Sequence, residues 1–415
     1  MSIPAWTAAE SAAGRRYRQL LFINDYPPSA LAGAPIIGRQ LFDEYDSNRM
    51  DVLHCASWNA EPASFLPCRH TAIRAYTTRL RPRRVFIPIE ATLNCLRLEK
   101  IMAVGRRIIR ERRVEALFST SYGAEMPHAA YFLAREFGLP FYYFEMDRLD
   151  AVCLAPITRR LITENRIAFL KSAKKLWLIS PAMIRAYKRL YGVDGELLHH
   201  FVDVERYERA SLATGERPKD KLRLVYTGSF NAIVQASMAW LCQSLNAGMT
   251  VAGRPVELTI YASSCPAGFE GPNVSYRGFI KHADVPEKLA ESDVLVVASS
   301  FDPPPGLREQ VETSMATKTV DYLAAGRPVL ILGPKFSGLV DYFGPYSCVV
   351  DALDDALLRR SLERLASDRV YVDDLCERGL ELVRKEHSLP ALRERFLSNF
   401  LVPARGTLGG HLAGA

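Results

Sequence analysis

Short apolar runs alternate with amphipathic segments along most of the chain, in two successive series. Apolar residues at helical spacing, such as positions 98, 101, 102, 108 and 109 of segment 96–113, predict helices between the apolar runs. The apolar runs predict strands at 19–24, 49–57, 114–120, 139–147 and 175–180 in the first series, and at 222–229, 256–263, 273–280 and 293–300 in the second. Strands that alternate with helices predict parallel sheets covered on both faces.

The polar, unpatterned stretch 204–220 separates the two series and is interpreted as a linker. The predicted fold is therefore α/β, with two doubly wound, Rossmann-like domains that face a cleft. Residues 17–203 form the first predicted domain and residues 221–387 the second, while a terminal helix at 388–402 is expected to pack back on the first. Open parallel sheets bind ligands at the carboxyl ends of their strands, so loops of both domains are expected to point into the cleft.

Composition narrows the class of protein further. A chain of 415 residues is too long for one ordinary domain. No apolar run reaches the roughly 18 to 20 residues that span a membrane, and residues 1–19 lack the layout of a secretory signal. The eight cysteines contain no closely spaced pair, which argues against zinc and favours reduced thiols and a cytoplasmic protein. Residues 1–19 and 403–415 are expected to be loose tails.

Segment 314–332 combines a polar loop, a short helix that ends at a glycine, and a buried strand. It places Lys318 and Asp321 three residues apart, which puts both side chains on one face at the start of the helix. Helix N-termini attract phosphate groups because their N–H groups are unpaired and the dipole favours negative charge. A cation for a diphosphate beside an acceptor for ribose hydroxyls would suit a nucleotide sugar. An ordinary surface helix is the alternative.

Four stretches give the chain a resemblance to GT-B-fold glycosyltransferases, and among these to glycosyltransferase family 4. They are DYPPSALAGAP after the first strand, KKLWLISPAMIRAYKRLYGVDGELLHHFVDVERY before the linker, LVYTGSF at the first strand of the second domain, and VDYLAAGRPVL. Their order along the chain is that of the family. The last stretch, preceded by Lys318, also resembles the K-x-x-E/D-Y-L-A-A-G arrangement of some bacterial polysaccharide glycosyltransferases.

The resemblance implies a donor site in the second domain. Asp321 stands at the second glutamate of the family's E-x7-E pair and is expected to accept hydrogen bonds from ribose hydroxyls. Ser314 stands at the first glutamate, where a serine cannot do the same job, and Glu309 or Glu312 are the candidate substitutes. The remaining predicted donor-site residues are Gly228, Ser229, Phe279, Ile280, Thr317, Lys318, Thr319 and Tyr322.

Two of these assignments follow from departures and matches in the family pattern. The basic pair that usually binds phosphate after the first donor-domain strand is missing from GSFNAIVQAS, so the diphosphate is assigned to Lys318 with backbone N–H groups near Thr317 and Thr319. Phe279 and Ile280 match the segment that holds the nucleobase by main-chain contacts, with a simple core role as the alternative.

On the acceptor side, the reaction needs a base for a hydroxyl proton, unless the leaving phosphate takes it. Glu145 and Asp147 lie two residues apart at the end of a predicted strand, where the family often has a His-Asp pair. Asp147 is the candidate catalytic base, with a helix-capping role as the alternative. His128 is a weaker candidate. Neither a metal nor another cofactor is expected, because Lys318 and the helix N-terminus can offset charge on the leaving diphosphate.

Basic residues are concentrated in segment 79–113, with eleven Lys or Arg against three Glu. Arg97, Lys100, Arg107 and Arg110 are expected on one helical face, where each could contribute about 1 kcal/mol beside anionic lipid. We expect peripheral attachment to the inner membrane face, with a solvated helix face as the alternative. Nucleic acid is not an expected partner, because no aromatic stacking pattern accompanies the arginines.

The resemblance, together with these residues, implies a glycosyltransferase. It would move a sugar from a nucleotide-diphosphate sugar to a lipid-linked or glycan acceptor, in the synthesis of a bacterial surface polysaccharide or exopolysaccharide. A GT-B-fold isomerase that acts on a nucleotide sugar is one alternative, and release of a sugar isomer without an acceptor would distinguish it. A non-catalytic binding protein that retains the fold is the other, because Ser314 and the missing basic pair depart from the family pattern.

Overall fold

A computed structural model describes residues 15–30, 34–56, 62–73, 87–121, 125–148, 156–213, 220–304 and 306–403, with side chains of 96–121 and 164–212 in the segments that begin at 87 and 156. The predicted tail 403–415, residues 79–86 and most of residues 1–19 thus lie outside the described part, apart from Pro403 and 15–19. Contacts divide the chain into two compact units. The first comprises residues 1–144, 154–176 and 393–415, and the second comprises residues 145–153 and 177–392.

A seven-stranded sheet organises the first unit, and its order places the two central strands at a topological switch point. The order is β4-β3-β2-β5-β6-β7-β8, and every described pairing is parallel. The chain runs outward from β2 to β4, then returns to add β5 on the other side of β2. The strands are β2 (Leu20–Asn24), β3 (Met50–Cys55), β4 (Arg69–Ile73), β5 (Ala116–Thr120), β6 (Phe141–Glu145), β7 (Ala173–Leu178) and β8 (Glu196–Leu197). By contacts, β8 and the last residues of β6 and β7 belong to the second unit.

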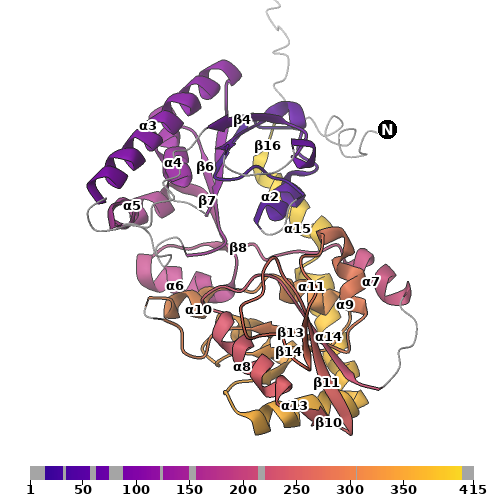
Figure 1. Cartoon of the computed structure of the whole chain (residues 1–415). Coiled ribbons are helices and arrows are strands. Elements are labelled where there is room, and N and C mark those ends of the chain that lie inside the picture. The colour runs from indigo at the N-terminus through magenta and orange to yellow at the C-terminus, as the bar shows by residue number, and fades with distance from the viewer. Residues whose placement is uncertain are drawn as a thin grey trace, which may run out of the picture. The chain divides into compact units, whose positions relative to one another are not determined.

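Helices cover both faces of this sheet (Figure 1). They are α2 (Ala34–Phe42), α3 (Ile87–Arg112), α4 (Glu125–Phe137), α5 (Pro156–Ser172) and α15 (Leu389–Leu397). On one face, Phe42 packs edge-on against Phe118 and Phe396, with ring centroids 5.1 Å apart in both pairs. Helix α3 starts nine residues before the predicted position, and β4 was not predicted because its side chains are only partly buried.

The two chain ends depart from the sequence-based expectation. Residues Arg15–Tyr17 were expected in a loose tail, and Leu401 in a helix, but they form strands β1 (Arg15–Tyr17) and β16 (Leu401–Pro403). These pair antiparallel, with Tyr17 opposite Leu401. Three-residue strands carry too few alternating positions to be recognised from a pattern, and their pairing joins residues nearly four hundred positions apart.

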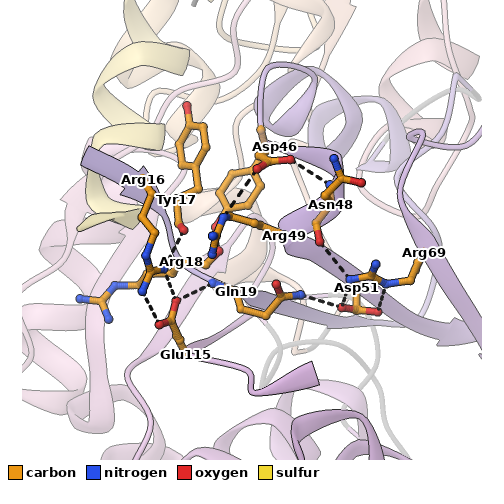
Figure 2. Close-up of polar contacts among 11 residues, drawn as sticks. Arg16, Tyr17, Arg18, Gln19, Asp46, Asn48, Arg49, Asp51, Arg69 and Glu115 are labelled. Atoms are coloured by element: carbon orange, nitrogen blue, oxygen red, sulfur yellow. Dashed lines mark hydrogen bonds and ion pairs between the residues drawn. The ribbon is translucent and has the colours of Figure 1, made fainter. Parts of the chain in front are cut away.

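Charged side chains tie together the amino ends of the strands in the first unit (Figure 2). Arg16 makes two 2.6 Å hydrogen bonds to Glu115, which also accepts from the backbone N–H of Gln19 at 2.9 Å. Arg69 donates to Asp51 at 2.9 Å. The contacts with Arg16 and Gln19 lower the pKa of Glu115 to about 2, and the Arg16 hydrogen bonds are the main cause. The network lies at the edge of the sheet opposite the carboxyl ends of the strands, so we assign it a role in the stability of the fold.

The sheet of the second unit repeats the same winding. Its order is β10-β11-β9-β13-β14-β15, with β12 on β11, and only β10 is antiparallel to its neighbour. Strands β9 and β13 therefore flank a second topological switch point. The strands are β9 (Leu222–Thr227), β10 (Thr250–Val251), β11 (Arg254–Tyr261), β12 (Val274–Tyr276), β13 (Val294–Ala298), β14 (Val329–Leu332) and β15 (Cys348–Val350).

Alternate residues of these strands enter two separate cores. Leu224 and Tyr226 belong to the core under α8 and α13, whereas Val225 belongs to the core under α9, α11 and α14. The period of two along each strand explains why the runs are continuously apolar. The helices of this unit are α6 (Pro181–Tyr191), α7 (Val204–Ala213), α8 (Gln235–Asn246), α9 (Val285–Ala290), α10 (Arg308–Thr313), α11 (Lys318–Ala324), α12 (Gly338–Phe343), α13 (Asp355–Ser367) and α14 (Arg369–Glu386).

The interpretation of 204–220 as an unpatterned linker was wrong for its first half. Residues 204–213 form α7, which packs within the second unit through the buried Tyr207. Its polar sequence hid the helix because a single large buried side chain does not create a visible period. Among the described residues, no helix is both long and apolar enough to cross a membrane.

Candidate functional site

The carboxyl end of β9 and the start of α11 meet at the switch point of the second sheet. Strand β9 ends at Thr227, and the chain continues through Gly228 and Ser229. Helix α11 begins at Lys318 and packs on the face of the sheet that contains Val225. Ligands of doubly wound folds bind beside a switch point, outside the carboxyl ends of the strands. This edge is therefore the candidate donor site.

Lys318 extends over the end of β9 to the opposite face of the sheet. Its Nζ atom lies 3.8 Å from the ring centroid of Tyr226, whose side chain belongs to the other core. Within the described part of the chain, no carboxylate pairs with this ammonium group. Burial lowers the pKa of Lys318 to about 7. A partly buried cation with an aromatic contact and no counter-ion is suited to receive an anionic ligand.

Gly228 leaves the space through which Lys318 passes. A Cβ atom at this position would lie 2.8 Å from Lys318 Nζ and 3.3 Å from its Cε. The backbone of Gly228 also has a φ of 119°, a conformation that other residues rarely adopt. Its N–H donates to the carbonyl of Tyr261 at 2.9 Å, which fixes the turn against β11. The turn thus favours glycine, and a Cβ atom here would also displace the end of the Lys318 side chain.

Two tyrosines hold the turn and the helix in place. The fully buried Tyr322 of α11 accepts a hydrogen bond from the backbone N–H of Thr227 at 2.7 Å. The hydroxyl of Tyr226 donates to the carbonyl of Ser229 at 2.8 Å. Tyr322, predicted as a donor-site residue, therefore acts from inside the core by joining α11 to β9. Tyr226 was not predicted, and its position in an apolar strand gave no signal for a role at the site.

Asp321 lies one turn after Lys318, and other residues of the second unit already contact its carboxylate. The hydroxyl of Tyr207 on α7 donates to Oδ1 at 2.5 Å, and His200 Nε2 lies 3.7 Å from Oδ2. Burial alone would raise the pKa of Asp321, but the nearby imidazole of His200 and the hydrogen bond from the Tyr207 hydroxyl hold it below its ordinary value. Its assignment to ribose hydroxyls stays a prediction, and the structure adds a second role that links α11 to α7.

The residues around the expected first glutamate also have partners. Ser314 caps the end of α10, and its N–H donates to the carbonyl of Gln310 at 2.7 Å. Glu309 forms a 2.8 Å ion pair with Arg148, and Glu312 accepts from Arg308 at 3.1 Å. Arg148 directly follows Asp147, so this ion pair joins the candidate base segment to α10. Sequence reasoning missed Arg148, because a single arginine after a strand gives no pattern.

The segment assigned to the nucleobase lies at the end of the edge strand β12. The alternative in which Phe279 is a core residue was wrong, because its side chain is 61% exposed. Gly278 before it has a φ of 78°, and its carbonyl accepts from the N–H of Ala262 at 3.0 Å. Ile280 is half-buried. An exposed phenylalanine beside a fixed turn is compatible with a stacking surface for a base.

The predicted threonines frame the first turn of α11. The backbone N–H of Thr319 donates to the carbonyl of Ala316 at 2.9 Å, and the carbonyl of Thr317 accepts from the N–H of Val320 at 3.1 Å. Thr319 is fully buried, and its hydroxyl has no hydrogen-bond partner among the described residues. The Thr319 N–H is therefore engaged inside the protein, which leaves Lys318 as the principal group for an anion here.

Asp147 follows β6 and keeps an exposed surface, although neighbouring protein atoms crowd around its carboxyl. The loss of hydration from this crowding, followed by the nearby charge of Glu145, raises the pKa of Asp147. The alternative in which Asp147 caps the next helix stays a prediction, because residues 149–155 lie outside the described ranges. His128 is fully buried and stacks on Phe169 with ring centroids 5.1 Å apart, as expected for a structural histidine.

The predicted basic face of α3 needs one correction. Arg97 does not belong to it: the side chain turns inward, 3.6 Å from Asp25 and 3.7 Å from Glu125. Lys100, Arg107 and Arg110 are exposed, as is Leu96 at 59%. Amphipathic spacing had suggested that Arg97 shares their face, and only the tertiary structure supplies the two buried carboxylates that draw it inward.

Groups of three or more His, Cys, Asp or Glu side chains that could hold a metal ion are absent from the described residues.

Comparisons with known proteins identify the fold. No family model matches the sequence, and no curated protein does. Among solved structures, sucrose-phosphate synthase from Thermosynechococcus elongatus is similar with a TM-score of 0.67 and 15% identity, covering 92% of this chain and 98% of the other. The chain has the GT-B fold. Two further solved structures are similar over nearly the whole of this chain.

WaaG, a glycosyltransferase involved in lipopolysaccharide biosynthesis, has a TM-score of 0.61 at 14% identity, with 94% of this chain and 100% of the other covered. HepE from Anabaena, in complex with UDP and glucose, has a TM-score of 0.63 at 12% identity, with 92% and 99% covered. At these identities the likeness is one of fold. The predicted GT-B architecture is thus confirmed, and membership of family 4 stays a resemblance in the sequence motifs.

Proposed function

We propose that this protein is a glycosyltransferase that moves a sugar from a nucleotide-diphosphate sugar to a lipid-linked or glycan acceptor, in the synthesis of a bacterial surface polysaccharide or exopolysaccharide. The observation that carries the proposal is Lys318, a cation without a carboxylate partner among the described residues, held at a switch point by Gly228 and Tyr226. The GT-B fold supports the same proposal, and HepE, which shares that fold, binds UDP-glucose.

In this proposal Lys318 contacts the diphosphate, and binding draws the amine back to its charged form because the anion replaces lost hydration. Phe279 offers an exposed ring to the base. Asp321 has two lone-pair-bearing oxygens, so it can accept a ribose hydroxyl while it keeps the bond from Tyr207. Ser229 and the turn at Gly228 complete the wall beside β9.

In the transfer the anomeric carbon gains one bond and loses one, and one proton moves from the acceptor to a base. The acceptor hydroxyl oxygen attacks the anomeric carbon, the bond from that carbon to the phosphate oxygen breaks, and the diphosphate leaves with the electron pair. Asp147 takes the hydroxyl proton, a role that its raised pKa favours because a stronger base accepts a proton more readily. Lys318 stabilises the charge that develops on the leaving diphosphate, so the proposed step needs no metal.

Donor binding is tested by thermal stabilisation with a panel of nucleotide sugars, because a ligand that binds the folded state raises its stability. We expect Lys318→Met to weaken binding of the stabilising nucleotide sugar by about tenfold or more, from the loss of a charge-assisted contact. Lys335→Met is the matched control, since Lys335 is an 85% exposed lysine on the same unit that pairs with Asp351. Equal binding by the wild type and the Lys318 variant would reject the donor site.

Attachment to an anionic membrane surface forms a second part of the proposal. The exposed Lys100, Arg107 and Arg110 on α3, with Leu96, offer charge complementary to anionic headgroups. Three such residues correspond to roughly 3 kcal/mol at low salt. Sedimentation with phosphatidylglycerol vesicles, compared with phosphatidylcholine vesicles, tests this part. A triple glutamine variant should lose the preference, whereas Arg369→Gln, exposed on α14, should keep it. Equal retention by both variants would contradict membrane attachment through α3.

A further inference from the structure

The switch point of the first sheet contains a polar cluster to which no role has been assigned. Strand β2 ends at Asn24 and continues to Asp25, its neighbour β5 ends at Thr120, and α4 begins at Glu125. Arg97 of α3 reaches this edge with its guanidinium group. Asn24, Asp25 and Glu125 are buried, with exposed fractions of 0%, 6% and 9%. The cluster lies entirely within the first unit.

Arg97 is close to two carboxylates but is not fully hydrogen-bonded. Its nearest atoms lie 3.6 Å from Asp25 and 3.7 Å from Glu125, beyond ordinary hydrogen-bond length. One Nη atom donates to the sulfur of Cys55 at 3.1 Å. Its Nε–H is buried and has no hydrogen-bond partner among the described residues. Most buried polar atoms have a hydrogen-bond partner, so this unpaired donor is available to an oxygen atom of a ligand.

Asn24 supplies a second unpaired donor, and its orientation is fixed. Thr120 donates to the amide oxygen of Asn24 at 3.1 Å, and the Thr120 hydroxyl lies 3.1 Å from the hydroxyl of Tyr26. This chain of hydroxyls directs the amide oxygen toward Thr120. The amide nitrogen is left without a hydrogen-bond partner among the described residues, although the side chain is fully buried. A fixed amide with an unpaired N–H₂ is costly unless a ligand oxygen accepts from it.

The charges of the cluster select among ligand classes. Asp25 and Glu125 carry two negative charges and Arg97 one positive charge, while burial raises the pKa of the Cys55 thiol to about 11 and keeps it neutral. The sum over these described residues is negative, which disfavours a phosphate or carboxylate. Two carboxylates that accept, beside an amide and a guanidinium that donate, match the hydroxyl groups of an uncharged sugar.

We propose that Asn24, Asp25, Arg97 and Glu125 form the binding site for an uncharged, hydroxyl-rich part of the acceptor, a neutral sugar residue. The inference rests on the proposed function, whose acceptor class it narrows. The unpaired N–H groups of Arg97 and Asn24 donate to sugar oxygens, and Asp25 and Glu125 accept from sugar hydroxyls. The site lies at the switch point of its own sheet, as the donor site does in the second unit.

Saturation-transfer NMR with the neutral methyl glycosides of glucose, galactose, mannose and rhamnose tests the site in the full-length protein. At least one glycoside should bind, and Arg97→Lys and Glu125→Gln should each weaken it by about tenfold or more, because each removes a hydrogen bond to a charged group. Arg97→Lys keeps the positive charge beside both carboxylates, so it preserves the fold while it removes the Nε–H donor. Arg106→Lys, on the same helix and paired with Glu136, is the matched control and should bind as the wild type does.

Three outcomes would overturn the inference. One is binding of a neutral glycoside with equal affinity to the wild type and both variants. Another is preference for glucuronate or a sugar phosphate over every neutral glycoside. The third is no binding of any neutral glycoside while the wild type is folded. The nucleotide-sugar titration of Lys318 is read separately: if the donor binds and these results fail, the proposed function stands without this acceptor site.

Discussion

The pKa of Lys318 makes a quantitative prediction for donor binding. Burial lowers it to about 7, so in the free protein the amine loses its proton as the pH rises through neutrality. A bound diphosphate favours the charged form and returns the pKa toward the ordinary value for lysine, about 10.4. Between these two values, each molecule that binds must take up about one proton. Affinity should therefore fall by about tenfold for each pH unit above neutrality.

The assay is calorimetric titration with the nucleotide sugar that stabilises the protein most, from about pH 6 to about pH 9. A nucleotide sugar is preferred to a free nucleoside diphosphate because a terminal phosphate itself titrates at about pH 6. Affinity should be constant below neutrality and about a hundredfold weaker at about pH 9, and at about pH 8 the measured enthalpy should vary with the ionisation enthalpy of the buffer.

Substitutions at the same position supply the controls. Lys318→Met should bind weakly at every pH, and Lys318→Arg should remove the dependence because a guanidinium stays charged throughout. The reasoning is refuted if the wild type binds equally well across the range, or if the methionine variant shows the same slope. Either result would mean that the diphosphate does not depend on this ammonium group.

Three further predictions concern the turn, the base and the amino-end network. Gly228→Ala should weaken donor binding by displacing Lys318, with a backbone cost of roughly 1–2 kcal/mol in unfolding experiments, and unchanged donor affinity would contradict the close approach. Asp147→Asn should lower kcat by about a hundredfold or more with little change in donor affinity, and an active variant would exclude it as the base. Glu115→Gln should cost about 1–2 kcal/mol at neutral pH after allowance for solvent screening. Because the pKa of Glu115 is lowered, its contribution is present above its ordinary value of 4.5 and is lost as the pH falls through about 2, so urea denaturation should show the difference from the wild type shrinking in acid.

Much of the fold could be predicted because the central strands bury both faces. The apolar runs at β2, β9 and β13 are visible without any partner, since burial on two sides demands apolar residues at every position. Elements that rely on a partner distant in the sequence were not predicted. Strand β1 exists because β16 pairs with it, and α7 is held by the buried Tyr207 and by Arg206, which donates to the carbonyl of His282. Local patterns contain no information on such pairings.

The residues of the candidate donor site were likewise predictable only in part. Lys318 and Asp321 could be selected from their spacing, and Gly228 from its place after a strand. Nothing in the sequence indicated that Tyr226 lies under the ammonium group or that Tyr207 contacts the aspartate. These contacts join α11 to β9 and to α7 across ninety to more than one hundred residues. Side-chain direction at the end of a sheet depends on the packing of elements that are far apart in sequence.

The sequence alone determined the α/β class, the two series of elements and the choice of Lys318 as the group for a phosphate, because periodicity, turn residues and charge are local properties. Tertiary structure decided which charges are available. Arg97 appeared in the sequence as one more member of a basic face, yet it lies beside Asp25 and Glu125. Lys318 has no such carboxylate partner among the described residues. The physical reason is that the partner of a charge is set by which strand ends and helices converge, and convergence follows from sheet order.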